Sequence, residues 1–362
     1  MPLLQKNVTD FQSRLNAVAD TASEWCDPEY GAREQAVAAT VDAPNRWTEQ
    51  ALNHALNRWM QQLTVDRLDE WAGPGAVEHS RIVGVLHGSS EPLDGFRSAL
   101  AVWILGHEYL GVVPEGSPAL LPAFAEDVMS RCDGVRSEFV EPDRVYASAD
   151  VVIVQCDDGE SAAREKAQTH GIPASHQLIR PPTYSVGILD GHESEDEMGR
   201  LAEDMLLYEG MGRRRLALLW APVEHPPDAY LEAMAGFRGL FPAHPDTPGT
   251  LQMQQAFLEA RDESHAYAEG LEFLVSRGAP EPQRPGHIRW SEYEELRDVT
   301  KWVSDHAEDL HAIIARRDLH NKLPEDWPLR TPGGVHIPPL NDEDGREVIS
   351  FLQTVGETVD TA

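Results

Sequence analysis

The sequence predicts an α/β protein with two domains. From about residue 81 onward, short apolar and β-branched runs alternate with segments of helical periodicity. The chain has 362 residues, which is enough for two hydrophobic cores. Short strands separated by helices form largely parallel sheets with helices on both faces, and such sheets bind ligands at the carboxyl ends of their strands.

The elements follow in order along the chain. The segment up to about Trp71 is expected to be helical, because Leu52, Leu56, Trp59 and Leu63 recur at steps of four and three. Strands are then expected at 81–87, 109–113, 151–154 and 184–189, and helices at 96–105, 120–131 and 160–170. Further on, we expect strands at 216–220, 270–275 and 287–290, helices at 227–237 and 252–261, a glycine turn at 331–336 and a last element at 348–355. The run at 309–315 fits a strand or a helix, because it is too short for periodicity to decide.

The charge of the chain is strongly acidic. Its net charge is −31, and its only lysines are Lys6, Lys166, Lys301 and Lys322. Dispersed carboxylates repel one another, and high ionic strength screens that repulsion, so the composition indicates a halophilic protein. The same composition argues against nucleic acid as a partner, because phosphate neutralisation needs a clustered cationic face.

Other features bear on compartment and metals. No apolar run approaches the length of about 18 residues that would span a membrane, and the amino terminus has no basic segment followed by a long apolar one. We therefore expect a cytoplasmic protein without a membrane span. The three cysteines form no Cys-x-x-Cys pair, and the spacings of His306, His311 and His320 do not align ligands on one helix face. No metal site is expected.

The most informative stretch is the turn at residues 208–215, between an amphipathic helix and an apolar strand. Ser194 and Glu197 form a capping-box pattern at the start of that helix. Gly210 is expected to end it. Gly210 and Gly212 allow positive φ or a close approach to a ligand, so this turn would present Arg213.

Several stretches resemble, in order and spacing, the acyl-CoA reductases, which are relatives of the aldehyde dehydrogenases. They are the Gly-x-Gly-Arg turn at 210–213, the Gly-Ser-Ser-Glu-Pro loop at 88–92, the strand at 183–191 and the Pro-Gly-Gly loop at 332–334. The resemblance covers most of residues 40–355 and implies a two-domain fold of the aldehyde dehydrogenase type. It implies a cofactor-type domain at 1–207 with a C-terminal return at 331–362, and a catalytic-type domain at 208–330.

The resemblance also implies a reaction, the NADPH-dependent reduction of an acyl thioester to an aldehyde. In that reaction a cysteine thiolate attacks acyl-CoA, coenzyme A leaves, and hydride is delivered to the thioacyl enzyme. Arg213 stands at the position of this cysteine, and its protonated guanidinium has no lone pair for the attack. Related enzymes have an asparagine in the first loop that helps to hold the oxyanion, and Ser90 is its nearest match in this chain. Together with Ser89, Gly333 and Gly334 it supplies the candidate ligand loops.

The cofactor turn departs from the family as well. Cys156, Asp157 and Asp158 stand where relatives have a Thr-Gly-Ser turn, and two carboxylates there would repel a pyrophosphate. This turn would therefore weaken the binding of NADP(H), the cofactor that the resemblance implies. Cys156 could serve as a migrated nucleophile. A buried, inert thiol is the commoner role, because no basic residue lies beside it in sequence to lower its pKa.

Departures at the nucleophile, the oxyanion position and the cofactor turn together predict a degenerate acyl-CoA reductase, a pseudoenzyme whose remaining ligand would be an acyl-CoA-like molecule. One alternative is a non-catalytic protein whose arginines 213–215 bind an anionic ligand or an acidic partner. Local ion pairing of these arginines with Asp204 or Glu209 would remove that role. A structural or homo-oligomeric role of the retained scaffold is the third hypothesis.

Overall fold

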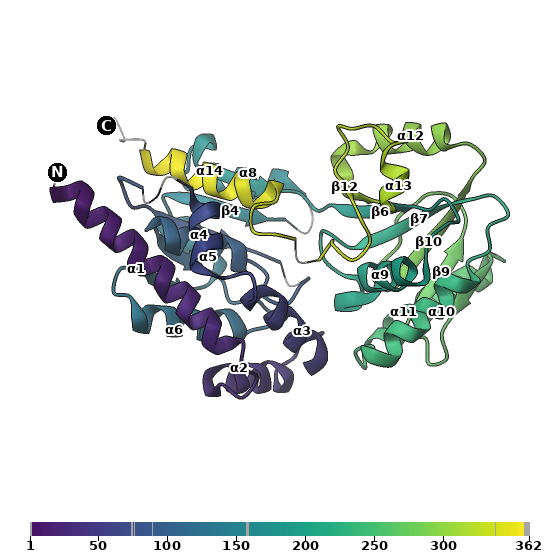
Figure 1. The fold of residues 1–362 in the computed structure, drawn as a ribbon, viewed down its shortest axis with the longest axis horizontal. Helices are drawn as coiled ribbons and strands as arrows, with labels where there is room; N and C mark the ends of the chain where they lie inside the picture. Colours follow the sequence, from purple (N-terminus) through teal and green to yellow (C-terminus); the bar gives the residue numbers. More distant parts are fainter. Residues whose placement is uncertain are drawn as a thin grey trace. The chain divides into compact units, whose positions relative to one another are not determined.

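The computed structural model describes residues 2–73, 75, 77–88, 90–156, 159–336 and 338–357. The chain forms two compact units. Unit 1 comprises residues 1–45, 52–182 and 339–362, and unit 2 comprises residues 46–51 and 183–338. Each unit has its own, largely parallel sheet with helices on both faces (Figure 1), so the predicted fold class is confirmed.

Unit 1 is built on a five-stranded parallel sheet of order β3-β2-β1-β4-β5. Its strands are β1 (Ile82–Leu86), β2 (Glu108–Gly111), β3 (Arg136–Phe139), β4 (Val151–Gln155) and β5 (Gln177–Arg180). From the central β1 the chain moves outward through β2 and β3 and then returns to β4 on the other side of β1. Such a reversal of strand order places a crevice at the carboxyl edge of a parallel sheet.

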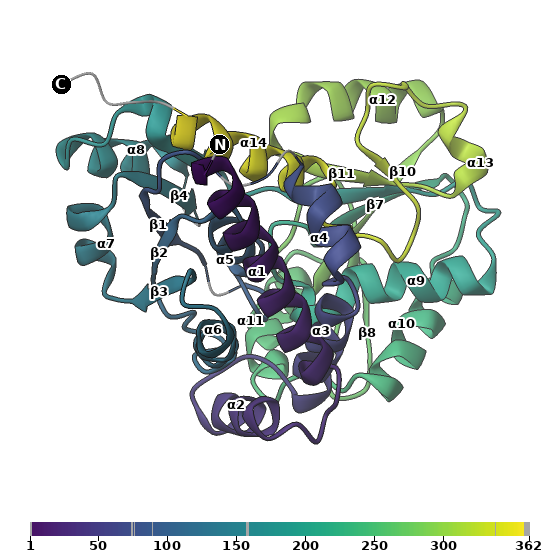
Figure 2. The same cartoon turned by 60° about the vertical axis from the view of Figure 1, so that its left-hand side comes forward.

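Helices cover both faces of this sheet. They are α1 (Pro2–Trp25), α2 (Gly31–Asp42), most of α3 (Glu49–Met60), α4 (Val65–Ala72), α5 (Phe96–Leu105), α6 (Leu120–Arg131), α7 (Pro142–Ser148), α8 (Glu160–Thr169), the 3-10 turn η1 (Ala174–His176) and α14 (Glu343–Glu357). Figure 2 shows α7 and α8 on one face and α5 and α6 on the other. All residues of α5 are buried, which is the pattern of a helix enclosed by other elements.

The carboxyl-terminal return of the chain to unit 1 is anchored by buried polar contacts. Arg97 of α5 forms a buried ion pair with Asp342, and its guanidinium lies 5.6 Å from the centre of the Trp59 ring. The Trp71 indole N–H donates to the carbonyl of Gly345 at 3.0 Å. These contacts hold the start of α14 against α4 and α5.

Unit 2 is built on a seven-stranded sheet of order β12-β11-β6-β7-β10-β9-β8, parallel except for the pair β8–β9. Its strands are β6 (Tyr184–Ile188), β7 (Leu216–Pro222), β8 (His265–Tyr267), β9 (Leu274–Arg277), β10 (His287–Tyr293), β11 (Leu310–Ile314) and β12 (Leu329–Arg330). Because β6 pairs with both β7 and β11, it belongs to this sheet. The boundary between the units thus lies at 182/183, which differs from the expected boundary at 207.

The helices of unit 2 form two layers. They are α9 (Glu195–Leu206), the 3-10 turn η2 (Leu207–Gly210), α10 (Asp228–Leu240), α11 (Thr247–Ala260), α12 (Leu296–Asp305), the 3-10 turn η3 (Ala307–Asp309) and α13 (Arg317–His320). Met205 of α9 and Met234 of α10 share a core cluster with Leu219. Val303 of α12 and Leu319 of α13 belong to a separate core cluster. Figure 1 shows α12 and α13 on the other side of the sheet from α9 and α10.

Most predicted elements are present, with some corrections. The run at 309–315 forms a strand, β11, and α11 begins at Thr247 rather than at 252. The strand expected at 270–275 is β9, at residues 274–277. The sequence analysis missed β3, α7, β5, β8, α12, α13 and β12. Within the described part of the chain, no helix combines the length and the apolar character needed to cross a membrane.

Two buried histidines are held neutral, one in each unit. Nδ1 of His107 accepts from the Arg81 backbone N–H at 3.1 Å, so Nε2 carries the proton and donates to the carbonyl of Leu352. His287 contacts Ser276 Oγ at 2.7 Å and Gln254 Oε1 at 2.9 Å. Burial is the largest cause that lowers the pKa of His107 to about 4 and that of His287 to about 3.

We expect acidification to destabilise both units through these histidines. Their pKa values are lower in the folded than in the unfolded chain, so below pH 6.5 only the unfolded state takes up the protons. The free energy of unfolding should therefore fall from pH 6.5 toward pH 4, by about 1.4 kcal/mol per pH unit for each histidine. Urea unfolding across this range in high salt measures the slope. His287→Gln should reduce it and the exposed His192→Gln should not; equal slopes in the two variants would contradict this explanation.

Candidate functional site

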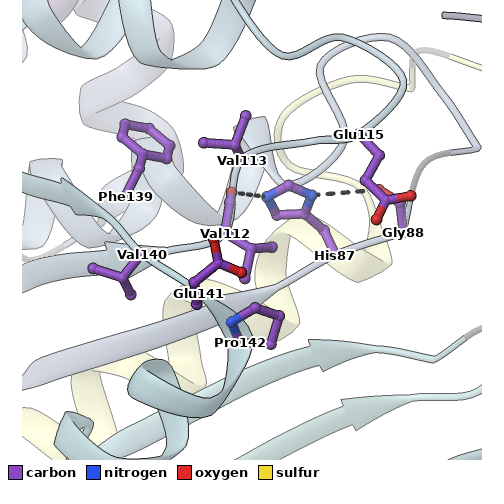
Figure 3. Close-up of a pocket in the computed structure, with 9 residues that line it drawn as sticks. All are labelled: His87, Gly88, Val112, Val113, Glu115, Phe139, Val140, Glu141 and Pro142. Atoms are coloured by element: carbon purple, nitrogen blue, oxygen red, sulfur yellow. Dashed lines mark hydrogen bonds between the residues drawn. The ribbon is translucent and has the colours of Figure 1, made fainter. Parts of the chain in front are cut away.

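A cavity of about 530 Å³ lies at the carboxyl edge of the unit 1 sheet. Its lining comes from the segments that directly follow three neighbouring strands: His87 and Gly88 after β1, Val112 to Glu115 after β2, and Val140 to Pro142 after β3. Figure 3 shows these side chains around the opening. This edge is where parallel α/β sheets bind their ligands.

His87 joins two of these segments. Its Nε2 lies 3.0 Å from the carbonyl of Val112, and its Nδ1 lies 3.4 Å from the carbonyl of Gly88, as the dashed lines in Figure 3 mark. Burial lowers the pKa of His87 to about 4, so the ring is neutral near pH 7. A neutral ring has one N–H, and the shorter contact assigns it to Nε2. His87 thus links the ends of β1 and β2 and forms one side of the cavity.

The remaining lining combines carboxylates with apolar groups. Glu115 and Glu141 are exposed at the cavity, and the half-buried Phe139 offers an aromatic ring. No lysine or arginine is among the described residues that line it. Such a surface can accept hydrogen bonds from hydroxyl groups and stack with a flat ring, and it repels phosphate.

The predicted ligand loop and cofactor turn lie only partly within the described residues. Ser89, Asp157 and Asp158 lie outside the described residues. The backbone N–H of Ser90 donates to the carboxylate of Asp94 at 3.0 Å, within a local turn. Cys156, directly after β4, is buried in a core cluster that also contains Val154.

The turn predicted to present residue 213 lies in unit 2, directly before β7. The capping box of Ser194 and Glu197 is confirmed at the start of α9. The helix ends at Leu206, and a 3-10 turn then runs to Gly210. Three consecutive residues of this turn are left-handed, with φ of 55° at Tyr208, 57° at Glu209 and 63° at Gly210.

Glycine is required at one of these positions. A Cβ at Gly210 would lie 2.8 Å from the carbonyl oxygen of Met205 and 2.9 Å from the backbone nitrogen of Gly286. Neither backbone atom can move without moving its element. For the two residues with side chains, the left-handed conformation costs roughly 1–2 kcal/mol each.

Side-chain contacts hold this strained turn. The carboxylate of Glu209 accepts from both terminal nitrogens of Arg238, at 3.2 and 3.3 Å, and from the hydroxyl of Thr247 at 2.5 Å. The Arg238 side chain is only 3% exposed, so this ion pair is buried. The ring of Tyr208 meets the rings of Trp47 and His336 edge to face, at 5.9 and 5.3 Å.

The three arginines that follow are tied to neighbouring strands through their backbone. The hydroxyl of Thr183 donates to the carbonyl of Arg213 at 3.0 Å, and that of Ser185 to the carbonyl of Arg214 at 2.9 Å. The Arg215 guanidinium donates to the carbonyl of Gln283 at 2.8 Å, and burial lowers its pKa. Arg213 itself is half-buried. The turn is thus fixed against β6 rather than projecting as a loop.

The predicted late loop meets the same region. The Asp204 carboxylate of α9 accepts from the N–H of Gly333 at 2.7 Å, and Gly333 has a φ of 88°. The next residue, Gly334, completes this turn. Together with the contact between His336 and Tyr208, these bonds bring the candidates Gly333 and Gly334 to the elements that carry Arg213. Ser90 and Cys156 belong to unit 1.

The sequence analysis missed the residues of the carboxyl-edge cavity. His87 and Glu115 follow predicted strands, so the rule that ligands bind at strand ends could have found them. Glu141 follows β3, whose polar sequence gave no strand signal. Among the described residues, no group of three His, Cys, Asp or Glu side chains is placed to hold a metal ion.

Comparison with known proteins defines the fold. No protein-family model and no curated protein sequence matches the chain. Solved structures of aldehyde dehydrogenases do match. An NAD-dependent benzaldehyde dehydrogenase from Corynebacterium glutamicum aligns with a TM-score of 0.68 and 10% identity, over 96% of this chain and 84% of that one.

Two further aldehyde dehydrogenase structures match the same fold. A salicylaldehyde dehydrogenase from Pseudomonas putida G7 aligns with a TM-score of 0.65 and 9% identity, over 90% of this chain and 78% of that one. Aldehyde dehydrogenase 21 from Physcomitrella patens aligns with a TM-score of 0.62 and 10% identity, over 86% and 74%. The chain therefore has the aldehyde dehydrogenase fold. These neighbours belong to the wider superfamily, and none of the three is an acyl-CoA reductase.

We expect two glycine-to-alanine changes in unit 2 to have opposite effects. Gly210→Ala should lower the free energy of unfolding by at least about 2 kcal/mol, because the methyl group meets two backbone atoms at positive φ. Gly236→Ala should raise it by about 0.5–1 kcal/mol, because Gly236 is exposed inside α10 with open space around it. Urea unfolding in high salt compares the two. A neutral Gly210→Ala would show that the turn is free to relax.

Proposed function

We propose that this chain is a degenerate relative of the acyl-CoA reductases that retains nucleotide binding in unit 1 and lacks the thiolate step. The observation that carries the proposal is the cavity at the carboxyl ends of β1, β2 and β3. Its position agrees with the general location of nucleotide sites in parallel α/β sheets, and its chemistry favours one part of such a ligand.

The lining favours an adenosine group. Phe139 and the valines after β2 and β3 provide an apolar surface for a flat base. Glu115 and Glu141 can each accept hydrogen bonds from ribose hydroxyls. A volume of about 530 Å³ suits a ligand of this size.

The same lining favours NAD(H) over the NADP(H) that the sequence resemblance implies. A carboxylate near the ribose accepts from a free 2′-hydroxyl, whereas a 2′-phosphate needs a cation such as arginine. The described lining contains two carboxylates and no arginine or lysine. The 2′-phosphate of NADP(H) would therefore meet like charge.

The loss of the thiolate step rests on where the thiols are. The sequence has three cysteines, Cys26, Cys132 and Cys156, and all belong to unit 1. Unit 2, which carries the turn at 208–215, has none. Arg213 stays protonated and cannot attack a thioester, so bound acyl-CoA would remain unreduced.

We expect NADH to bind at least tenfold more tightly than NADPH. Titrations that follow the quenching of tryptophan fluorescence in molar KCl measure the affinities for both nucleotides. Both affinities should rise with salt concentration, because salt screens the acidic surface of the protein. Glu115→Arg should improve NADPH binding relative to NADH, whereas Glu165→Gln, an exposed change on α8, should leave the ratio unchanged. Equal affinities for the two nucleotides, or a ratio that Glu115→Arg does not move, would remove the support for this site.

A cysteine in the turn should restore the first chemical step only. In Arg213→Cys, the thiolate attacks the thioester carbonyl and coenzyme A leaves as a thiol, which adds one acyl group to the protein mass. Slow acylation with little aldehyde is expected, because hydride transfer also requires a cofactor held in register. Intact-mass analysis with acyl-CoA detects the product, with Arg214→Cys as the matched control. Robust NADPH-dependent aldehyde formation by the wild type, abolished in Cys156→Ala, would overturn the proposal.

A further inference from the structure

A second cavity, of about 440 Å³, lies in unit 2 beside the left-handed turn. Glu209 and Met211 of the turn form part of its lining. Arg46 contributes from the short segment 46–51, and Arg284 from the loop before β10. These residues are far apart in sequence, so the cavity is a product of the fold and is not apparent from any single motif.

Both arginines are available to a ligand. Neither Arg46 nor Arg284 forms an ion pair with any residue that the structure describes; the polar contact of Arg46 is Nη1 to Met211 Sδ, at 3.4 Å. The chain has 61 carboxylates against 30 lysines and arginines, so potential partners are abundant. Two guanidinium groups that remain unpaired at one cavity in such an acidic protein provide a local excess of positive charge.

The carboxylates at this cavity do not cancel that charge. Glu209 is already neutralised by Arg238, at 3.2 Å, and by the Thr247 hydroxyl. The Asp246 side chain is 85% exposed, and its Oδ2 lies 3.7 Å from Nδ1 of His244. With Glu209 counted as neutralised by Arg238, the two arginines outnumber the one remaining carboxylate, Asp246.

The backbone adds to the positive electrostatic potential at this cavity. Helix α11 has 14 residues and begins at Thr247, and both Thr247 and Thr250 line the cavity. The amino end of a helix carries partial positive charge and unpaired N–H groups. Helix and arginines therefore favour the same kind of ligand.

We propose that this cavity binds a small molecule through its oxyanion group, a phosphate or a carboxylate. A guanidinium presents two parallel N–H donors that match either group. Arg46 and Arg284 bind the oxygens, and Met211 and Pro285 contact the apolar part of the ligand. The site lies within unit 2 and does not depend on nucleotide binding by unit 1.

Calorimetric titration of the whole chain with inorganic phosphate, and separately with succinate, tests the proposal at constant ionic strength. We expect saturable binding of at least one probe. Arg46→Gln and Arg284→Gln should each weaken it about tenfold or more, since a hydrogen bond to a charged group is lost. Arg297→Gln is the matched control, because Arg297 is exposed elsewhere in unit 2. The probe that binds more tightly identifies the oxyanion.

Chemical protection provides an independent measurement on the unaltered chain. The bound probe should slow phenylglyoxal modification of Arg46 and Arg284, but not that of Arg297, as followed by peptide mass spectrometry. The described lining of the unit 1 cavity contains no arginine, so protection of Arg46 and Arg284 reports on this site and not on the nucleotide site. Absence of saturable binding of either probe to the wild type, or undiminished affinity in the Arg46→Gln/Arg284→Gln double variant, would overturn the proposal.

Discussion

The buried ion pair between Glu209 and Arg238 fixes the longest left-handed run of backbone in the described part of unit 2, and much of that unit depends on it. Two residues with side chains adopt left-handed φ there, at a cost of roughly 1–2 kcal/mol each. Breaking the pair would leave a guanidinium that is 3% exposed without its counter-charge, which costs about 3–5 kcal/mol in buried pairs. The turn therefore cannot relax without a larger loss. Helices α10 and α11 meet at this carboxylate, because one supplies Arg238 and the other Thr247.

The acidity of the chain matters for the arginines that line a cavity without an ion-pair partner among the described residues. In a chain of net charge −31, mobile cations surround the protein and carboxylates compete for each arginine. Arg97 and Arg238 each form a buried ion pair that holds elements together. Arg46 and Arg284 form no ion pair with a described residue, and they line a cavity in which Arg238 already neutralises Glu209. These two cavities thus differ in charge: the unit 1 cavity presents carboxylates, whereas the unit 2 cavity presents guanidinium groups.

The sequence predicts the fold well where one face of an element is strongly apolar. Helix α6 was predicted with its observed bounds, because Leu120, Leu121, Phe124 and Val128 lie at helical spacing and are all buried. β3 was missed because it is short and exposes Arg136 and Glu138, and β8 because it has only three residues, none of them buried. Helix α12 was missed because its buried apolar stripe is reduced to Val299 and Val303. Neither cavity could be predicted in full, since each unites residues from three or more segments that only tertiary structure brings together.

The turn at 208–215 has a backbone shape that its own packing requires. A Gly-x-Gly turn resembles a device for presenting a nucleophile, yet Gly210 has a packing reason of its own, because Met205 and Gly286 leave no room for a Cβ. The backbone carbonyls of Arg213 and Arg214 are bonded to hydroxyls at and beside β6, whatever side chains these residues carry. Selection for a stable junction between α9 and β7 would keep the glycines and the backbone geometry, and it would place no demand on the side chain at 213. The shape of the turn is therefore evidence about the fold, whereas the identity of residue 213 is evidence about the reaction, and in this chain that residue is a cation.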